Sequence, residues 1–208
     1  KQLRGARLAH AIQRGPDELF ELDHDRIAEA VLPAAGDSAR VALHVRLVRA
    51  LEREPVDLSE VLSEQYLGAG MPLEAAGSAR RAADHALETL AFARAAQLYE
   101  RALALGQWSM QEKAALSRDH AVALEHSGRT LDAAEAYARA AALTGDALEA
   151  AVLEQRAAVR LMHNGHYRSG ERILKRGYAR LGLRWPASRI ELLLSVAYLS
   201  LPVRVRQM

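Results

Sequence analysis

Two histidine-containing patterns are the places where the residue types and spacing of this sequence could do chemistry. His163 and His166 stand three residues apart, and a pair of imidazoles at this spacing can bind a metal ion. They flank a turn that contains glycine, with no carboxylate or further histidine close in sequence, so we interpret them as ordinary turn histidines. His24 lies between Asp23 and Asp25, an arrangement more typical of a helix start, where acidic side chains are stabilised by the helix dipole. We expect no metal site at either position.

Motifs for nucleotide binding and for zinc-dependent hydrolysis are missing from the sequence. The phosphate-binding patterns GxxxxGK followed by Ser or Thr and GxGxxG do not occur, and neither does HExxH. Residues 24–26 have the letters of the kinase catalytic loop in the wrong order, and no DFG motif follows. We therefore predict no catalytic residue, no cofactor and no enzymatic activity in this chain. The alternative in this class is an active site within the helices that uses His120 or His126.

The composition excludes thiol chemistry. The chain of 208 residues contains no cysteine, which rules out a disulfide framework, a thiolate zinc site and a cysteine nucleophile, and which is compatible with a reducing cytosol. The longest apolar stretch, Leu192 to Val203, is shorter than the roughly 20 residues that a membrane-spanning helix needs. No secretory signal pattern is evident from Lys1 to Gln13. We predict a cytoplasmic protein without a membrane span.

Positive charge is concentrated toward one end of the chain. The net charge is +2, but the residues from Arg168 onward include nine Lys or Arg and two acids, so the preceding part carries −5. Most of the basic residues between Arg168 and Arg180 fall on one side of a predicted helix, where they could contact nucleic-acid phosphates. No interleaved aromatic residues or recognition helix accompany them. We expect a solvated face or a contact with an acidic protein surface, and not nucleic-acid binding.

The elements that must position any functional side chain begin with a mixed segment over residues 1–54. The expected order is a helix from Leu3 to Gln13, a short strand near residues 19–22, a helix from 24 to 32 capped by Asp23, and a helix capped by Ser38 that runs to about Arg53. This order predicts a winged-helix-like remnant followed by linking helices.

Residues 55–185 show a repeated helical pattern. A small residue is followed four positions later by a large apolar residue and three positions after that by another small one. The three occurrences are 38 and 37 residues apart. They are Ala95, Tyr99 and Ala102, then Ala133, Tyr137 and Ala140, then Gly170, Leu174 and Gly177. Turns that contain Gly128 and Gly165 precede the last two. Self-similarity of this kind predicts an all-α solenoid of antiparallel helical hairpins, which stack because one hairpin cannot bury its apolar face alone. We expect four helices between Leu58 and Leu105, or three if the junction at Leu90 and Ala91 is continuous.

The pattern around Ala133, Tyr137 and Ala140, with Gly128 before it, resembles the tetratricopeptide repeat (TPR) consensus. The resemblance implies a right-handed solenoid whose first helix in each hairpin lines a groove for a peptide or a neighbouring domain. The candidate groove residues that it implies are Arg80, Asp84, Glu88, Arg118, Val122, Glu125, His126, Gln155, Val159, Met162 and His163. Their mixed charge favours a polar partner over an apolar helix.

A second resemblance spans most of the chain. The runs from Asp23 to Val31, Leu43 to Glu52, Ala91 to Tyr99 and Tyr178 to Pro186 are similar to a region of large bacterial signal-transduction P-loop ATPases, in which a winged helix is followed by TPR-like repeats. Some members of that family carry a serine/threonine kinase domain and others a DNA-binding domain. The resemblance implies a regulatory sensor or scaffold region cut from a longer protein. The alternative is an inducer-sensing helical domain of a DNA-binding transcriptional regulator.

Residues 186–208 are expected to start a further helix. Its apolar residues Leu192, Leu193, Val196, Leu199 and Leu201 need a partner surface. They could pack on the preceding hairpin, be covered by residues beyond Met208, or meet a second copy of the chain in a dimer. The predicted partners are therefore a protein or peptide, including other domains of the same polypeptide.

Overall fold

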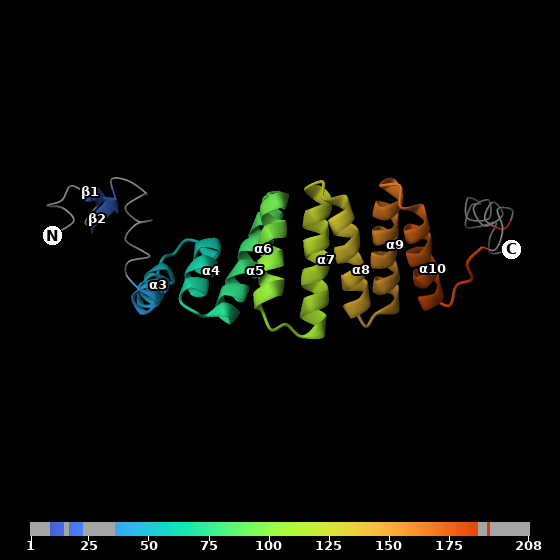
Figure 1. Ribbon diagram of the computed structural model, residues 1–208, viewed down its shortest axis with the longest axis horizontal. Helices are drawn as coiled ribbons and strands as arrows, with labels where there is room; N and C mark the ends of the chain where they lie inside the picture. The colour runs from blue at the N-terminus through green and yellow to red at the C-terminus, as the bar shows by residue number, and fades with distance from the viewer. Residues whose placement is uncertain (1–8, 15–16, 23–35, 187–190, 192–208) are drawn as a thin grey trace. The chain divides into compact units, whose positions relative to one another are not determined.

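A computed structural model describes residues 9–14, 17–22, 36–186 and 191 (Figure 1). In this part of the chain it contains a two-stranded hairpin and eight helices. The elements are β1 (Ala9–Arg14), β2 (Asp17–Leu22), α3 (Asp37–Leu51), α4 (Ser59–Gly68), α5 (Pro72–Glu88), α6 (Phe92–Leu105), α7 (Met110–His126), α8 (Thr130–Leu143), α9 (Ala147–His163) and α10 (Tyr167–Arg180). The chain divides into two compact units, residues 1–81 and residues 82–208. Residues 36–186 are all-helical, as predicted.

The N-terminal segment differs from the prediction. β1 and β2 pair antiparallel, with Ala11 opposite Phe20. The strand expected near residues 19–22 is confirmed as part of β2, whereas the helix expected from Leu3 to Gln13 is wrong from Ala9 onward. A segment this short gains little from helix formation alone, and a neighbouring strand can supply its backbone hydrogen bonds. The helix predicted from 24 to 32, with Asp23 as its cap, lies outside the described residues.

In the first unit, α3 packs against α4 through a glycine and a histidine. A Cβ added at Gly68 would lie 2.6 Å from the imidazole ring of His44, so the missing side chain leaves space for that ring. Nδ1 of His44 is 2.8 Å from Oε1 of Gln65. Helix α3 begins at Asp37, and Gly36 holds the capping position. Ser38 therefore lies within the helix, and the expectation that it caps the helix is wrong.

In the second unit, successive helices pack against one another in chain order from α6 to α10, and the last turns of α5 join the same core (Figure 1). The core consists mainly of alanine and leucine, with two fully buried tyrosines, Tyr99 and Tyr137. Alanine has the highest helix propensity and leaves little side chain between helix axes, so helices rich in alanine can approach closely. None of the described helices is long and apolar enough to cross a membrane.

Polar side chains cap two of the helices in this unit, α7 and α9. The hydroxyl of Ser109 accepts a hydrogen bond from the backbone N–H of Glu112, and the carboxylate of Glu112 accepts one from the backbone N–H of Ser109, so both ends of a capping box are present at α7. Asp146 accepts a hydrogen bond from the backbone N–H of Leu148 at 2.9 Å and caps α9. The first residues of α7 and α9 are therefore fixed by capping contacts between residues that are close together in the sequence.

The turns between paired helices share one backbone conformation. Gly128 and Gly165 have φ values of 85° and 83°, and Leu90, which stands 38 residues before Gly128, has a φ of 61°. Leu90 is the one non-glycine residue of the described chain with a positive φ, and its side chain is 69% exposed. The left-handed conformation costs an L-amino acid about 1–2 kcal/mol, and little buried contact offsets it here. This turn separates α5 from α6, so the junction at Leu90 and Ala91 is not continuous. Three helices, α4, α5 and α6, lie between Leu58 and Leu105, and the expectation of four is wrong.

We expect the substitution Leu90→Gly to raise the free energy of unfolding by up to about 1 kcal/mol, because relief of the left-handed strain exceeds the extra entropy of an unfolded glycine. Urea unfolding followed by circular dichroism measures the change. Leu131→Gly is the matched control: Leu131 is also exposed but lies in α8, where glycine should cost about 1 kcal/mol. Equal losses in the two variants would contradict strain at Leu90.

Candidate binding surfaces

The predicted groove residues lie on three helices of the described chain. Arg80 is half-buried on α5 and belongs to the first unit. Asp84 and Glu88 follow it on α5 and are exposed, within the second unit. The other eight lie on α7 and α9. Those on α7 are Arg118, Val122, Glu125 and His126, and those on α9 are Gln155, Val159, Met162 and His163.

Apolar side chains stand among these residues at accessible positions. Val122 of α7 and Val159 of α9 are half-buried and stand 37 residues apart, and Met162 is also half-buried. His163 is exposed, and His126 is exposed with its ring stacked on Phe92 at a centroid distance of 4.7 Å. Partly accessible apolar groups beside exposed polar ones can contribute to a protein-binding surface.

Two charged members of the predicted row are already engaged within the protein. Glu125 forms an ion pair with Arg160, and its Oε2 accepts a hydrogen bond from the hydroxyl of Tyr137 at 2.8 Å. Nη1 of Arg156 donates to the same hydroxyl at 3.4 Å. The Glu125 and Arg160 side chains are 20% and 25% exposed, so this network holds α7, α8 and α9 together.

Arg118 also has internal partners. Its Nε lies 3.0 Å from Oδ1 of Asp119, and its Nη1 lies 3.5 Å from Oε1 of Glu149 at the start of α9. Arg118 and Glu149 both line a hollow of about 630 Å³ beside the α8–α9 connection. Arg118 therefore links α7 to α9, a contact that the spacing of the repeats does not reveal.

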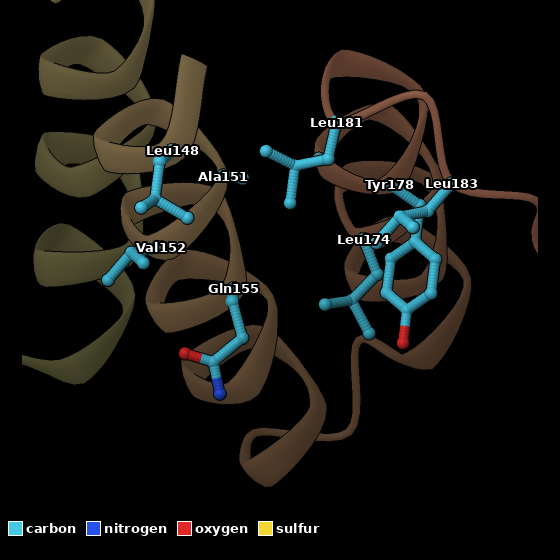
Figure 2. A pocket seen from close by; sticks show the side chains of 9 residues that line it. Leu148, Ala151, Val152, Gln155, Leu174, Tyr178, Leu181 and Leu183 are labelled. Carbon is cyan, nitrogen blue, oxygen red and sulfur yellow. The ribbon is translucent and has the colours of Figure 1, made fainter. Parts of the chain in front are cut away.

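An apolar pocket of about 320 Å³ lies between α9 and α10 (Figure 2). Figure 2 shows the side chains of Leu174 and Leu181 extending toward α9 from α10 and the turn that follows it. The residues that line the pocket are Leu148, Ala151, Val152, Gln155, Leu174, Gly177, Tyr178, Leu181 and Leu183. Of these, Gln155 belongs to the predicted groove. Leu148 and Val152 are apolar residues of α9 that the structure leaves 62% and 46% exposed.

A buried carboxylate stands on the same pair of helices. Oε1 of Glu154 lies 3.2 Å from Nε of Arg180 and 3.9 Å from Nε of Arg176. A Cβ added at Gly177 would lie 3.3 Å from Oε2 of Glu154, so the glycine leaves room for the carboxylate. The residues that stand 37 positions before Glu154 and Gly177 are Ser117 and Ala140. Arg176 and Arg180, two of the basic residues of α10, therefore neutralise the buried carboxylate of Glu154.

His120 is buried in α7, and neither of its ring nitrogens has a hydrogen-bond partner. Burial lowers the pKa of His120, and the positive charge of Arg139 lowers it further. The charged groups that act on it also include Glu100 and Asp132, which oppose this shift, and Arg129, which adds to it. The imidazole is therefore neutral near pH 7.

We expect the free energy of unfolding to fall as the pH drops below about 6.5, the pKa of an unperturbed histidine. Below that pH the unfolded chain binds a proton at His120 that the folded chain does not bind until lower pH, so stability is complete above 6.5 and is lost below it. His120→Leu should reduce the slope between pH 7 and pH 5, whereas His163→Leu, at an exposed histidine, should leave it unchanged. Urea unfolding at several pH values measures both slopes, and equal slopes in His120→Leu and the unsubstituted chain would contradict the prediction.

No group of three His, Asp or Glu side chains in the described residues is close enough to hold a metal ion. In comparisons with known proteins, no family model matches this sequence and no curated protein is significantly similar to it.

Proposed function

We propose that this chain is a TPR-like array of helical hairpins that binds a protein or peptide and catalyses no reaction. The observation that supports the proposal best is the equivalence of the three hairpins α5–α6, α7–α8 and α9–α10. The small residues at positions 37 or 38 residues apart on the second helices are buried alike, and the turn residues Leu90, Gly128 and Gly165 all have positive φ values. Ala95, Ala133 and Gly170 are buried, and so are Ala102, Ala140 and Gly177.

The two buried tyrosines make similar hydrogen bonds, although the carboxylates that accept them are 41 residues apart and do not hold equivalent positions. The hydroxyl of Tyr99 donates to Asp84 at 2.7 Å, and the hydroxyl of Tyr137 donates to Glu125 at 2.8 Å. Each tyrosine lies on the second helix of a hairpin and each carboxylate on the first. Repeated hairpins that contact their neighbours along a row form extended surfaces suited to binding an extended partner.

The proposed contact surface includes Val122 and Val159. They hold the same position on the first helices of two hairpins and both are half-buried, Val122 with part of its side chain packed against the core. Arg118 and Glu125, by contrast, hold helices together, so their replacement would disturb packing as well as binding. The valines therefore report on partner binding more directly than the charged residues do.

The resemblance to bacterial signal-transduction ATPases supports one setting for this activity. The run from Ala91 to Tyr99, which carries part of that resemblance, forms the start of α6 and includes the first buried residues of that helix. We propose that the chain is a sensor or scaffold region of such a regulator. Its partner is then a neighbouring domain of the same polypeptide or a protein that the regulator controls.

Photo-crosslinking in cells tests the proposal. A photoreactive amino acid is placed at Val122 or Val159 in the longest natural polypeptide that contains this chain, and crosslinked peptides are identified by mass spectrometry. We expect both positions to crosslink to the same protein or domain. The controls are Glu135 and Arg139, which are exposed on α8. Equal labelling at all four positions, or different partners at the two valines, would count against a shared binding surface.

A further inference from the structure

Two hollows of different chemistry share the start of α9 as a wall. The apolar pocket between α9 and α10 is lined by Leu148 and Val152 of this helix, and the hollow beside the α8–α9 connection is lined by Asp146 and Glu149. These four residues fall within about two turns of one helix. A partner segment that crosses the start of α9 can therefore enter both hollows.

The two hollows occupy equivalent places in successive hairpins. Six of the residues that line the pocket stand 37 positions after residues that line the hollow beside the α8–α9 connection. Among them, Leu181 and Leu183 of the pocket correspond to Thr144 and Asp146 of the hollow. The array thus presents the same site twice in a row, once with apolar walls and once with polar ones.

Both hollows adjoin the contact surface proposed above. Val122 stands four residues after Arg118, which lines the hollow, and Val159 stands four residues after Gln155, which lines the pocket. Residues four apart lie on one side of a helix. A partner that contacts the two valines therefore passes beside both hollows.

The pocket between α9 and α10 fits an apolar side chain. Its walls include Leu148 and Val152 on α9, with Leu174 and Leu181 facing them (Figure 2). None of the described residues that line the pocket is charged. With a volume of about 320 Å³ it has room for a leucine or an aromatic side chain, whose removal from water favours binding.

The hollow beside the α8–α9 connection fits a basic group. Among the described residues that line it, two are acidic, Asp146 and Glu149, and one is basic, Arg118. Nε of Arg118 lies 3.0 Å from Asp119, whereas its Nη1 lies 3.5 Å from Glu149, whose side chain is 40% exposed. The carboxylates therefore outnumber the guanidinium, and the charge of an added lysine or arginine complements the excess.

We propose that the partner in the binding function proposed above, on which this inference rests, is an extended segment that places a large apolar side chain in the pocket and a lysine or arginine in the hollow. An α-helix with its side chains is about 10 Å wide, and an extended chain advances about 3.3 Å per residue. The apolar and the basic residue of the partner should therefore stand about three or four positions apart.

Selection of short random peptides displayed on phage tests the chemistry of the partner. The target is the immobilised 208-residue chain. We expect the recovered peptides to be enriched in a large apolar residue that has a lysine or arginine about three or four positions away. Acidic residues at that place, or no enrichment over a surface without the protein, would overturn the proposal.

Two substitutions locate the recovered peptides on the protein. Their affinity, measured by fluorescence anisotropy, should fall about ten-fold for Leu148→Ser and about three-fold for Glu149→Gln. The second loss should shrink at high salt, because added ions screen the charge. The matched controls, which should leave the affinity unchanged, are Leu131→Ser and Glu171→Gln. Leu131 is exposed and is the second residue of α8, as Leu148 is of α9, and the Glu171 side chain is 47% exposed on α10.

Equal losses in the substituted and the control variants would overturn the proposal, and helix content by circular dichroism verifies that each variant is folded. A second copy of the chain is the rival occupant of the pocket. Sedimentation of the unsubstituted chain and of Leu148→Ser should give the same mass for both. A dimer that Leu148→Ser dissociates would assign the pocket to the second copy and overturn the proposal as well.

The outcomes separate this inference from the proposed function. Peptide affinities that neither Leu148→Ser nor Glu149→Gln changes, together with shared crosslinks at Val122 and Val159, would remove the two-part site and leave the binding function standing. Peptides that depend on both residues, without shared crosslinks at the valines, would leave the two-part site standing and remove the surface at the valines.

Discussion

Replacement of Tyr137 by alanine is expected to lower the free energy of unfolding of the second unit by about 3–5 kcal/mol. The side chain is fully buried in the core of α6 to α9, so its removal leaves a cavity of the size of an aromatic ring. It also ends the hydrogen bond to Glu125 and the contact of the Arg156 guanidinium with the tyrosine ring, whose centroid lies 5.7 Å away. Urea unfolding followed by far-UV circular dichroism, which reports helix content, measures the loss.

Two controls separate the cavity from the hydroxyl. Tyr137→Phe keeps the ring and should cost about 0.5–2 kcal/mol, because Glu125 retains Arg160 as a partner. Tyr167→Ala should change the stability by less than about 0.5 kcal/mol, since Tyr167 is 68% exposed. A loss below about 1 kcal/mol for Tyr137→Ala would show that Tyr137 is not a central packing residue.

The substitution Gly170→Ala is expected to lower the free energy of unfolding by about 1–3 kcal/mol, although alanine normally stabilises a helix relative to glycine by about 1 kcal/mol. A Cβ at residue 170 would lie 2.9 Å from the carbonyl oxygen of Ala158 and 2.7 Å from Cγ of Met162. The methionine can move, but the backbone carbonyl of α9 cannot move without a shift of α10.

Gly77→Ala is the matched control for this effect. Gly77 lies within α5, and a Cβ added there meets no other atom within 4 Å. The substitution should therefore raise stability by about 0.5–1 kcal/mol through helix propensity. Thermal unfolding of the two variants side by side gives the comparison. A gain in stability for Gly170→Ala similar to that for Gly77→Ala would mean that α9 and α10 are not in close contact at this point.

Local patterns in the sequence predicted the helices and the small residues at their crossings. The run of small, large and small residues at Ala133, Tyr137 and Ala140 sets which side of α8 is buried, and glycine at 128 sets the turn before it. These features depend on spacing within one or two helical turns, so the residues alone carry the information. The N-terminal segment lacks this pattern, and its structure differs from the prediction. Strand β1 forms by pairing with β2, and the residues of β1 by themselves do not indicate that partner.

The candidate binding surface could be predicted only in part. Alignment of the repeats identified Val122 and Val159, which are accessible, but it also selected Arg118 and Glu125, whose side chains join neighbouring helices. Periodicity assigns a residue to a side of its own helix. It does not say whether a charge on that side meets solvent or a partner such as Arg160 of another helix.

The sequence by itself determined that residues 36–186 form helices, because propensity, spacing and turn residues act over a few positions of one chain segment. The tertiary structure decided where the repeats depart from one another. Gly170 and Gly177 stand where Ala133 and Ala140 stand one repeat earlier. In the structure, the missing Cβ at Gly170 leaves room for a backbone carbonyl of α9, and the missing Cβ at Gly177 leaves room for the buried carboxylate of Glu154. Such contacts join atoms on separate helices, and their distances follow from how closely the helices approach, which no single segment encodes.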